Sequence, residues 1–346
     1  MRERLFKLIG ALILAGSLAL GWMWMEYRAF RENPMTVGES GQIVIVTPGM
    51  SLNAVARNLQ QQQLIRNYHL FVWMARLEGK AGRIQAGEYE VVQGMTPPQL
   101  LQQMVEGKVH QYAITLVEGL TFRELMQQLD ANPYLRHELV GLDAKAVMAK
   151  LGHPDEHPEG RFLPETYHFP RGLSDVEFLR RAYQAMQERL EYEWQARAEG
   201  LPFKSPYEAL ILASIVEKET GLQSERRAIA GVFIRRLQKR MRLQTDPTVI
   251  YGLGMDFDGN LRRRDLLSDT PYNTYTRRGL PPTPIAMPGA DAIHAALHPD
   301  DSDKLYFVAR GDGSHHFSAT LEEHNQAVIE YQLKGRKRNF SSYPEK

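Results

Sequence analysis

The sequence of 346 residues contains no cysteine. This absence excludes a disulfide scaffold, thiol catalysis and cysteine-ligated metal sites. The chain also has little net charge, with a formal value of +1 at pH 7, which argues against nucleic acid as its main partner. What remains is the composition of a globular protein, with 43% hydrophobic and 24% charged residues, and the length suits two or three domains.

Several common catalytic and ligand-binding motifs are absent as well. No Walker loop, G-x-S-x-G elbow or G-x-G-x-x-G turn follows a predicted strand. The acidic stretch 256–260 resembles a calcium loop, but leucines stand where an EF-hand requires glycine and glutamate. Three histidines could ligate a metal only if the fold gathered them, and no H-E-x-x-H motif supports that (His315, His316 and His324). We therefore expect no metal and no cofactor.

An apolar run without a charge covers residues 8–25, and its length of 18 residues suits a membrane span. Trp22 and Trp24 stand at its far end, where interfacial aromatic residues gather. Cations precede the run, whereas the charges that follow it cancel, so the positive-inside rule predicts a cytoplasmic N-terminus and an external remainder. We expect an uncleaved anchor over residues 1–26.

Two alternatives to an anchor remain. A signal peptide could be cleaved near Ala15-Gly16-Ser17, but the apolar run continues beyond that poor site. A buried helix of a soluble protein would not need the charge asymmetry that flanks the run.

A strand–glycine–helix unit recurs three times between residues 42 and 130. Each strand leads into a glycine, an apolar residue and a serine or threonine that suits a helix N-cap (Ser51, Thr96 and Thr121). The spacing of the units is irregular, which argues against a solenoid. Such modules suit binding of an extended ligand or orientation of a neighbouring domain, and a purely structural role stays open. A polar linker is expected before them, over 27–41.

The rest of the chain is predicted to be mainly helical, with some β elements. Helices are expected over 174–198, 207–221, 226–242 and 321–333, and a strand over 305–309. The proline-rich stretch 279–289 predicts a rigid, non-helical wall. We expect an α+β protein with a connecting region over 131–205 and a C-terminal domain over 206–346.

The helix over 207–221 is the element around which the C-terminal domain is expected to form. Residues 209–216 are apolar apart from one serine, too apolar for a surface helix, and Gly221 is expected to end the helix in the left-handed conformation. Two glutamates, Glu217 and Glu219, stand near its end. Helical geometry places Glu219 on an apolar stripe and Glu217 about 200° further round (the stripe is Leu212, Ile215 and Val216).

Glu219 is therefore the candidate acid. Desolvation and the electronegative helix C-terminus both raise the pKa of a carboxyl group, and a protonated Glu219 near neutral pH is what general-acid chemistry requires. The alternative is a solvated helix end, at which both glutamates pair with neighbouring cations (Lys218, Arg226 or Arg227).

A polar and aromatic segment follows this helix along the chain. Aromatic faces together with amide and carboxylate groups suit sugar rings, so six residues are candidates for substrate binding: Gln244, Thr245, Asp246, Tyr251, Asn273 and Tyr275. For Asp246 the stronger interpretation is a helix N-cap, because Pro247 follows it at the favoured first helical position.

Several of these motifs together resemble those of the YceG-like family, the endolytic murein transglycosylases. The resemblance rests on A-S-I-V-E-K-E-T-G, M-R-L-Q-T-D-P-T-V-I-Y-G, Y-N-T-Y, G-L-P-P-x-P-I-x-x-P-G and L-Y-F-V-A, and extends through E-G-x-F-x-P-E-T-Y to the N-terminal anchor. One departure is that Ser314 and His315-His316-Phe317 stand where the family usually has Gly-Gly-His-x-Phe, which leaves the role of His315 open.

The resemblance implies a fold and a catalytic residue. It implies a LysM-like subdomain over 42–130, a mainly helical, lysozyme-like catalytic domain over 206–346, and Glu219 as the catalytic glutamate. Glu219-Thr220 is also similar to the Glu-Ser pair of lysozyme-like transglycosylases.

The activity implied is cleavage of the bond between N-acetylmuramic acid and N-acetylglucosamine without water, which leaves 1,6-anhydro ends and terminates nascent glycan. The expected location is a bacterial inner membrane, with the catalytic domain in the periplasm. The expected partners are peptidoglycan strands, glycan polymerases and penicillin-binding proteins. Two alternatives stay open: a muramidase that hydrolyses the same glycan, and a glycan-binding scaffold without activity.

Overall fold

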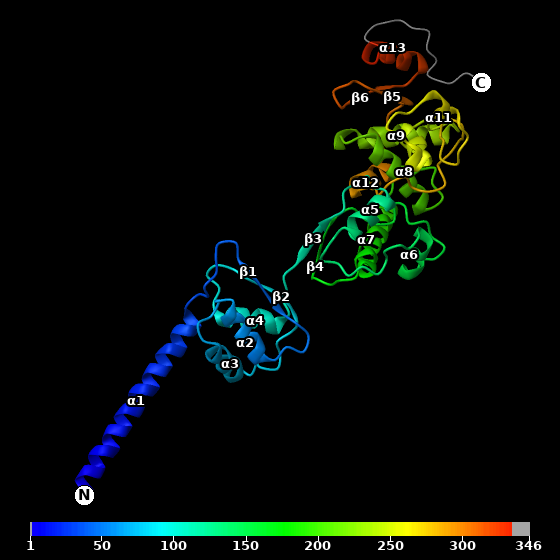
Figure 1. Cartoon of the computed structure of the whole chain (residues 1–346). Helices are drawn as coiled ribbons and strands as arrows, with labels where there is room; N and C mark the ends of the chain where they lie inside the picture. The colour runs from blue at the N-terminus through cyan, green and yellow to red at the C-terminus, as the bar shows by residue number, and fades with distance from the viewer. Residues whose placement is uncertain (1, 334–346) are drawn as a thin grey trace. The chain divides into compact units, whose positions relative to one another are not determined.

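The computed structural model describes residues 2–333, which form helices and three pairs of short strands (Figure 1). The chain divides into two compact units. The first unit contains the residues up to Tyr112 together with His168–Gly172, and the second contains the remainder. This mixture of helices and strands agrees with the predicted α+β class.

The first element, α1 (Arg2–Glu32), is a single continuous helix with a mean hydropathy of 1.9 over its most apolar window. It is long and apolar enough to cross a membrane, and the side chains of that window are exposed. The structure differs from the linker expected over 27–41, because the helix continues to Glu32. Tyr27 and Met35 are buried in the hydrophobic core of the first unit.

The first unit is built around one antiparallel strand pair. β1 (Gln42–Val46) pairs with β2 (Gly87–Val91), and α2 (Leu52–Gln61) and α3 (Tyr68–Leu77) lie between them in the sequence. A further helix, α4 (Pro97–Glu106), follows β2. Ser51 and Thr96 are the N-caps of α2 and α4, as predicted. The strand and helix faces share one core, which includes Val44, Phe71, Tyr89 and Leu100.

Most of the third strand–helix repeat lies in the second compact unit, whereas the first two repeats lie in the first unit. β3 (Tyr112–Thr115) pairs with β4 (Thr166–Phe169), and α5 (Phe122–Asp130) begins at the predicted cap Thr121. From Ala113 onward this repeat is part of the second unit. The compact unit therefore ends before residue 130, where the sequence placed the end of the modules.

The second unit contains a helical core. Besides α5, the helices before the central one are α6 (Ala144–Leu151) and α7 (Asp175–Gln195), the latter capped by Ser174. The central helix, α8 (Pro206–Glu219), contacts α7, α9 (Arg226–Gln238), α10 (Asp246–Leu253) and α12 (Ala290–Leu297). Short helices fill the connections: η1 (Gln223–Glu225), η2 (Gly254–Asp256) and α11 (Arg263–Leu267). Residues 209–216 of α8 are all buried, as their apolar character predicts.

A hairpin and a last helix complete the second unit. β5 (Tyr306–Ala309) pairs antiparallel with β6 (His315–Ser318), with Phe307 opposite Phe317. α13 (Leu321–Tyr331) packs on both strands. The proline-rich stretch 279–289 contains no helix or strand, and several of its residues are buried, as expected for a rigid wall.

Candidate active site

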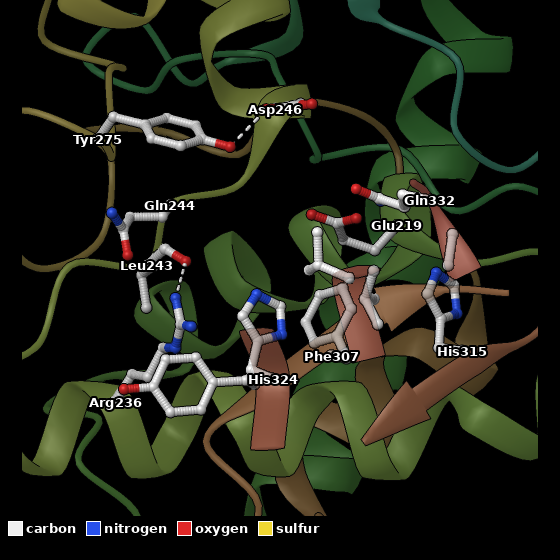
Figure 2. A pocket seen from close by; sticks show the side chains of 14 residues that line it. Glu219, Arg236, Leu243, Gln244, Asp246, Tyr275, Phe307, His315, His324 and Gln332 are labelled. Carbon is white, nitrogen blue, oxygen red and sulfur yellow. Dashed lines mark hydrogen bonds between the residues drawn. The ribbon is translucent and has the colours of Figure 1, made fainter. Parts of the chain in front are cut away.

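Glu219 lies in a cavity of about 420 Å³ within the second unit (Figure 2). The cavity is formed by the end of α8, Arg236 of α9, the segment that leads into α10, the loop that carries Tyr275, strand β5, the first residue of β6, and α13. Its lining residues are Glu219, Arg236, Leu243, Gln244, Asp246, Tyr275, Tyr306, Phe307, Val308, Ala309, His315, His324, Val328 and Gln332. Polar and aromatic side chains are thus gathered around one carboxyl group.

The position of Glu219 follows from the burial of α8. Because the preceding turns are held in the core, the last residue of the helix is fixed at the cavity wall. The helix does not end at Gly221 as predicted. Thr220 is the C-cap in an extended conformation, with φ −146° and ψ 135°, and Gly221 has no left-handed φ. The chain therefore leaves α8 directly after the glutamate.

The side chain of Glu219 is half-buried, and its carboxylate accepts a hydrogen bond from the hydroxyl of Thr245. Burial is the main influence on this carboxyl group, and it raises the pKa of Glu219 to about 7. The Thr245 hydrogen bond opposes that rise, the negative charge of Asp246 adds to it, and the charges of His315 and Arg236 oppose it. The group is poised to hold or release a proton near neutral pH.

Thr245 is itself a fixed donor. Its side chain is buried, and its backbone N–H donates to the hydroxyl of Thr274 at 3.1 Å. Gln244, the residue before it, has a left-handed backbone with φ 53° and donates its N–H to the carbonyl of Thr274 at 3.2 Å. A non-glycine residue in this conformation costs roughly 1 kcal/mol, so the surrounding contacts impose the turn that brings Thr245 to Glu219.

Asp246 lines the same cavity but is not a helix cap. Thr245 occupies the N-cap position of α10, and Asp246 is the first helical residue. Its carboxylate instead accepts a hydrogen bond from the Tyr275 hydroxyl at 2.5 Å (Figure 2). Burial and the neighbouring charge of Asp246 raise the pKa of Tyr275, so this phenol remains a proton donor. The predicted capping role is wrong by one residue.

Two of the predicted substrate-binding residues lie elsewhere. The Tyr251 hydroxyl donates to Glu159 at 2.9 Å, and both residues line a second cavity of about 1000 Å³. Asn273 is buried and does not line the cavity around Glu219. Its amide donates to three backbone carbonyls, and its oxygen accepts from the N–H of Tyr275 at 2.8 Å. Asn273 therefore supports the loop that presents Tyr275.

Glu159 is a second carboxyl group with an altered pKa. It is 3% exposed and accepts hydrogen bonds from Tyr251 and from the backbone N–H of Phe122 at 2.9 Å each. Burial raises the pKa of Glu159 to about 7, and these two hydrogen bonds partly offset the rise. Glu159 begins the motif E-G-x-F-x-P-E-T-Y, but the sequence alone predicts no role for it.

Arg236 and His315 both line the cavity. His315 is already singled out by the sequence, whereas Arg236 is identified only by the structure. Arg236 donates to the carbonyl of Leu243 at 2.8 Å (Figure 2), and to that of Leu305 at 2.7 Å. It thus connects the segment before Gln244 to the residue that precedes β5. Its position in α9, among other arginines, gives no signal in the sequence.

His315 forms the opposite wall of the cavity. Its Nδ1 lies 2.7 Å from Glu225, which also accepts its backbone N–H at 3.0 Å. In Figure 2, Tyr275 and Gln244 lie on one side of Glu219 and His315 lies on the other. The departure from the family pattern at 314–317 therefore falls at the cavity wall.

Glu217 lies away from the cavity, as the helical spacing predicts. Its two oxygens accept hydrogen bonds from Arg226 and from the backbone N–H of Gly289, each at 3.0 Å. Arg226 also pairs with Glu118 at 3.0 Å. Burial raises the pKa of Glu217, and the Gly289 hydrogen bond and Arg226 act in the opposite direction. Glu217 therefore forms the ion pair expected of a solvated helix end, whereas Glu219 forms no ion pair with the described residues.

Comparison with known proteins relates the chain to one family. A protein from Bacillus subtilis named endolytic murein transglycosylase is 32% identical over 338 residues, covering 92% of this chain and 91% of the relative. A protein of the same name from Streptococcus pneumoniae is 25% identical and covers 94% of this chain and 64% of the relative.

Solved structures and family models agree with these relatives. A crystal structure of a yceG-like protein from Listeria monocytogenes is 30% identical, with a TM-score of 0.52, covering 84% of this chain and 99% of that one. The model of the YceG-like family matches residues 44–330. The chain therefore belongs to the YceG-like family.

Proposed function

We propose that this protein is a membrane-anchored lytic transglycosylase that cleaves peptidoglycan strands between N-acetylmuramic acid and N-acetylglucosamine. The observation that carries the proposal is the carboxyl group of Glu219, which has a pKa of about 7 and stands in a polar and aromatic cavity. The names of the relatives from Bacillus subtilis and Streptococcus pneumoniae support the same activity.

The first chemical step requires an acid. Protonated Glu219 donates its proton to the oxygen that links the two sugars, the bond from that oxygen to C1 of the muramoyl residue breaks, and an oxocarbenium-like state develops at C1. The N-acetylglucosamine side leaves as an alcohol. Burial favours the protonated form that begins this step.

The second step uses the same group as a base. The Glu219 carboxylate takes the proton of the muramoyl 6-hydroxyl, and the oxygen of that hydroxyl bonds to C1 to close the 1,6-anhydro ring. Water is neither consumed nor released, and Glu219 is again protonated. Thr245, together with the charges of His315 and Arg236, favours the carboxylate that exists between the two steps.

Hydrolysis of the same bond is the second candidate, because Asp246 lines the same cavity as Glu219. A hydrolase of the usual kind uses two carboxylates that flank the bond. The Tyr275 hydroxyl that binds Asp246 holds this second carboxylate in place. The third hypothesis is a scaffold without catalytic activity, and any release of muropeptides by the protein would exclude it.

Product masses separate these possibilities. Peptidoglycan is digested with the purified protein, and the released fragments are compared with those from a known muramidase. Anhydro products are lighter than hydrolysed ones by one water, about 18 Da. We expect the lighter series, and products carrying only the added water would overturn the lyase assignment.

The first unit and α1 support the finer parts of the proposal. The antiparallel pair β1–β2, with two helices between its strands, supports a LysM-like role in associating with glycan. The helical core around α8 supports a lysozyme-like catalytic domain. The cations before the apolar run support a cytoplasmic N-terminus and a periplasmic catalytic unit.

An anchored enzyme acts close to the membrane, where glycan strands are made. Termination of nascent strands, in the vicinity of glycan polymerases and penicillin-binding proteins, therefore fits this proposal.

A further inference from the structure

A carboxylate and two imidazoles meet on the second unit, at a place that shares no residue with the cavity around Glu219. Glu193 lies in the last turn of α7, His294 lies in α12, and His298 is the residue that caps the C-terminus of α12. One donor atom of each side chain lies within 4.8 Å of the others. We propose that these three residues form a binding site for a divalent transition-metal ion of the Zn²⁺ type.

The two histidines are arranged as a chelating pair. Residues four apart on a helix lie on the same face, one turn above the other. The rings of His294 and His298 are stacked, with centroids 4.3 Å apart and an angle of 26° between their planes. Both rings approach the same oxygen of Glu193, at 2.9 Å from His294 Nδ1 and 3.7 Å from His298 Nε2.

These separations are close to those of a bound ion. Zinc holds nitrogen and oxygen donors at about 2.0–2.2 Å in a tetrahedron, which places the donors roughly 3.3 Å from one another. The two measured distances lie on either side of that value. The three donor atoms lie within 4.8 Å of one another, so an ion would draw them together by rotation of the side chains.

The charge of the cluster also favours a cation. Glu193 is 4% exposed, and a buried carboxylate is costly unless it is paired. One of its oxygens faces Arg189 at 3.3 Å, and the other faces only the two imidazoles among the described residues. A divalent ion would add positive charge at that second oxygen.

The donor set and the exposure point to the kind of ion. Two imidazole nitrogens and one carboxylate oxygen suit zinc and similar transition metals, whereas Mg²⁺ and Ca²⁺ prefer oxygen ligands alone. The side chain of His294 is 51% exposed, so solvent reaches the cluster and water can provide a fourth ligand. The site would join α7 to α12, both of which contact α8.

The test uses the full-length protein in detergent, produced without a histidine tag and freed of metal with a chelator. Zinc chloride is titrated into it by calorimetry, and thermal unfolding is followed with and without zinc. The variants are H294A, H298A and E193Q. The matched control is H137A, because His137 is exposed and lies outside the cluster. Magnesium chloride serves as the oxygen-preferring control ion.

We expect one zinc ion per chain, a higher unfolding temperature with zinc, and no binding of magnesium. Each of the three variants should weaken zinc binding at least about tenfold, whereas H137A should bind like the wild type. The proposal is overturned if zinc fails to bind at concentrations up to the millimolar range. It is equally overturned if binding persists unchanged when both His294 and His298 are alanine, because the three residues would then form only a hydrogen-bonded cluster.

Discussion

The hydroxyl of Thr245 donates a hydrogen bond to the carboxylate of Glu219, and it reaches that carboxylate because Gln244 adopts a left-handed backbone. This contact works against burial, which raises the pKa of Glu219. The balance between the two sets the pH range in which the carboxyl group can act as an acid. Each of the first three predictions alters a carboxyl group of α8 or a neighbour that sets this balance.

Replacing Thr245 by valine should raise the pKa of Glu219 above about 7, because the hydrogen bond that favours the carboxylate is lost. Since the first step needs the protonated acid, the alkaline limb of the pH–rate profile should move to higher pH. The measurement is the rate of anhydro-muropeptide release across a pH series. An alkaline limb that stays in place would show that Thr245 does not control Glu219.

Asp246→Asn should move the alkaline limb of the pH–rate profile to lower pH. The negative charge of Asp246 raises the pKa of Glu219, so its removal should lower that pKa and shift the alkaline limb to lower pH. For a lyase we expect activity to survive at the new optimum. Loss of all cleavage by a folded D246N protein would instead favour the two-carboxylate hydrolase.

The two glutamates of α8 should behave differently when each is changed to glutamine. E219Q keeps the size of the side chain but removes the transferable proton, so activity should fall by about 10²–10⁴-fold or more, with stability unchanged or slightly raised. E217Q leaves the cavity intact but removes the charge that pairs with buried Arg226. It should cost about 1–3 kcal/mol of stability and little activity. The reverse pattern in muropeptide assays and thermal melts would refute the assignment of the acid.

The stabilisation contributed by Glu219 and Glu159 should fall as pH rises from about 5 to 7, whereas the histidines with lowered pKa values (His157, His298 and His324) act in the opposite direction. Glu219 and Glu159 have pKa values of about 7 when folded, above the ordinary value of 4.5, so the folded state binds more protons than the unfolded state in this range. The stabilisation is complete below the unfolded pKa and is lost as pH approaches 7, by roughly 1–3 kcal/mol for each group.

Urea unfolding at a series of pH values measures this loss. E219Q should gain stability relative to the wild type as pH rises through this range, because one of the two glutamates with a raised pKa is gone. Equal slopes for the two proteins would contradict the raised pKa of Glu219.

The direction of α1 can be tested with a reporter fused after Lys346. The cations before the apolar run predict export of the C-terminus, so a reporter that works only outside the cytoplasm should be active. A fusion active only in the cytoplasm would reverse the orientation. A mature N-terminus near Leu18 would favour the cleaved signal peptide instead.

Local sequence patterns predicted the helices that form the site better than they predicted which residues line its cavity. The burial of α8 and the separation of Glu217 from Glu219 follow from helical periodicity, which depends on neighbours in the sequence alone. The sequence predicts Asp246 as the N-cap of α10, but Thr245 takes that position. The side chain of Asp246 instead accepts a hydrogen bond from Tyr275, which is distant in the sequence. Such a competition between local and tertiary partners is not visible in a sequence.

The remaining differences also arise from long-range contacts. Tyr251 and Asn273 have the chemistry of sugar-binding residues, but Glu159 and three backbone carbonyls bind them elsewhere. Arg236 is fixed at the cavity by a hydrogen bond to Leu305, which lies 69 residues away in the sequence, so its own helix does not reveal this role. The pair His294 and His298 lies four residues apart, but its third member is Glu193, 101 residues from His294.

The burial of Tyr27, near the end of α1, and of Met35, just after it, joins this helix to the core of the first unit. A helix of 31 residues is roughly 46 Å long, whereas the hydrocarbon layer of a bilayer is about 30 Å thick. If residues 8–25 cross the bilayer as proposed, the remaining turns of α1 would form a short helical stalk whose Tyr27 is packed in the core of the first unit. Any tilt of the stalk in the membrane would turn that unit with it, and its height above the lipid surface would be set by helix geometry.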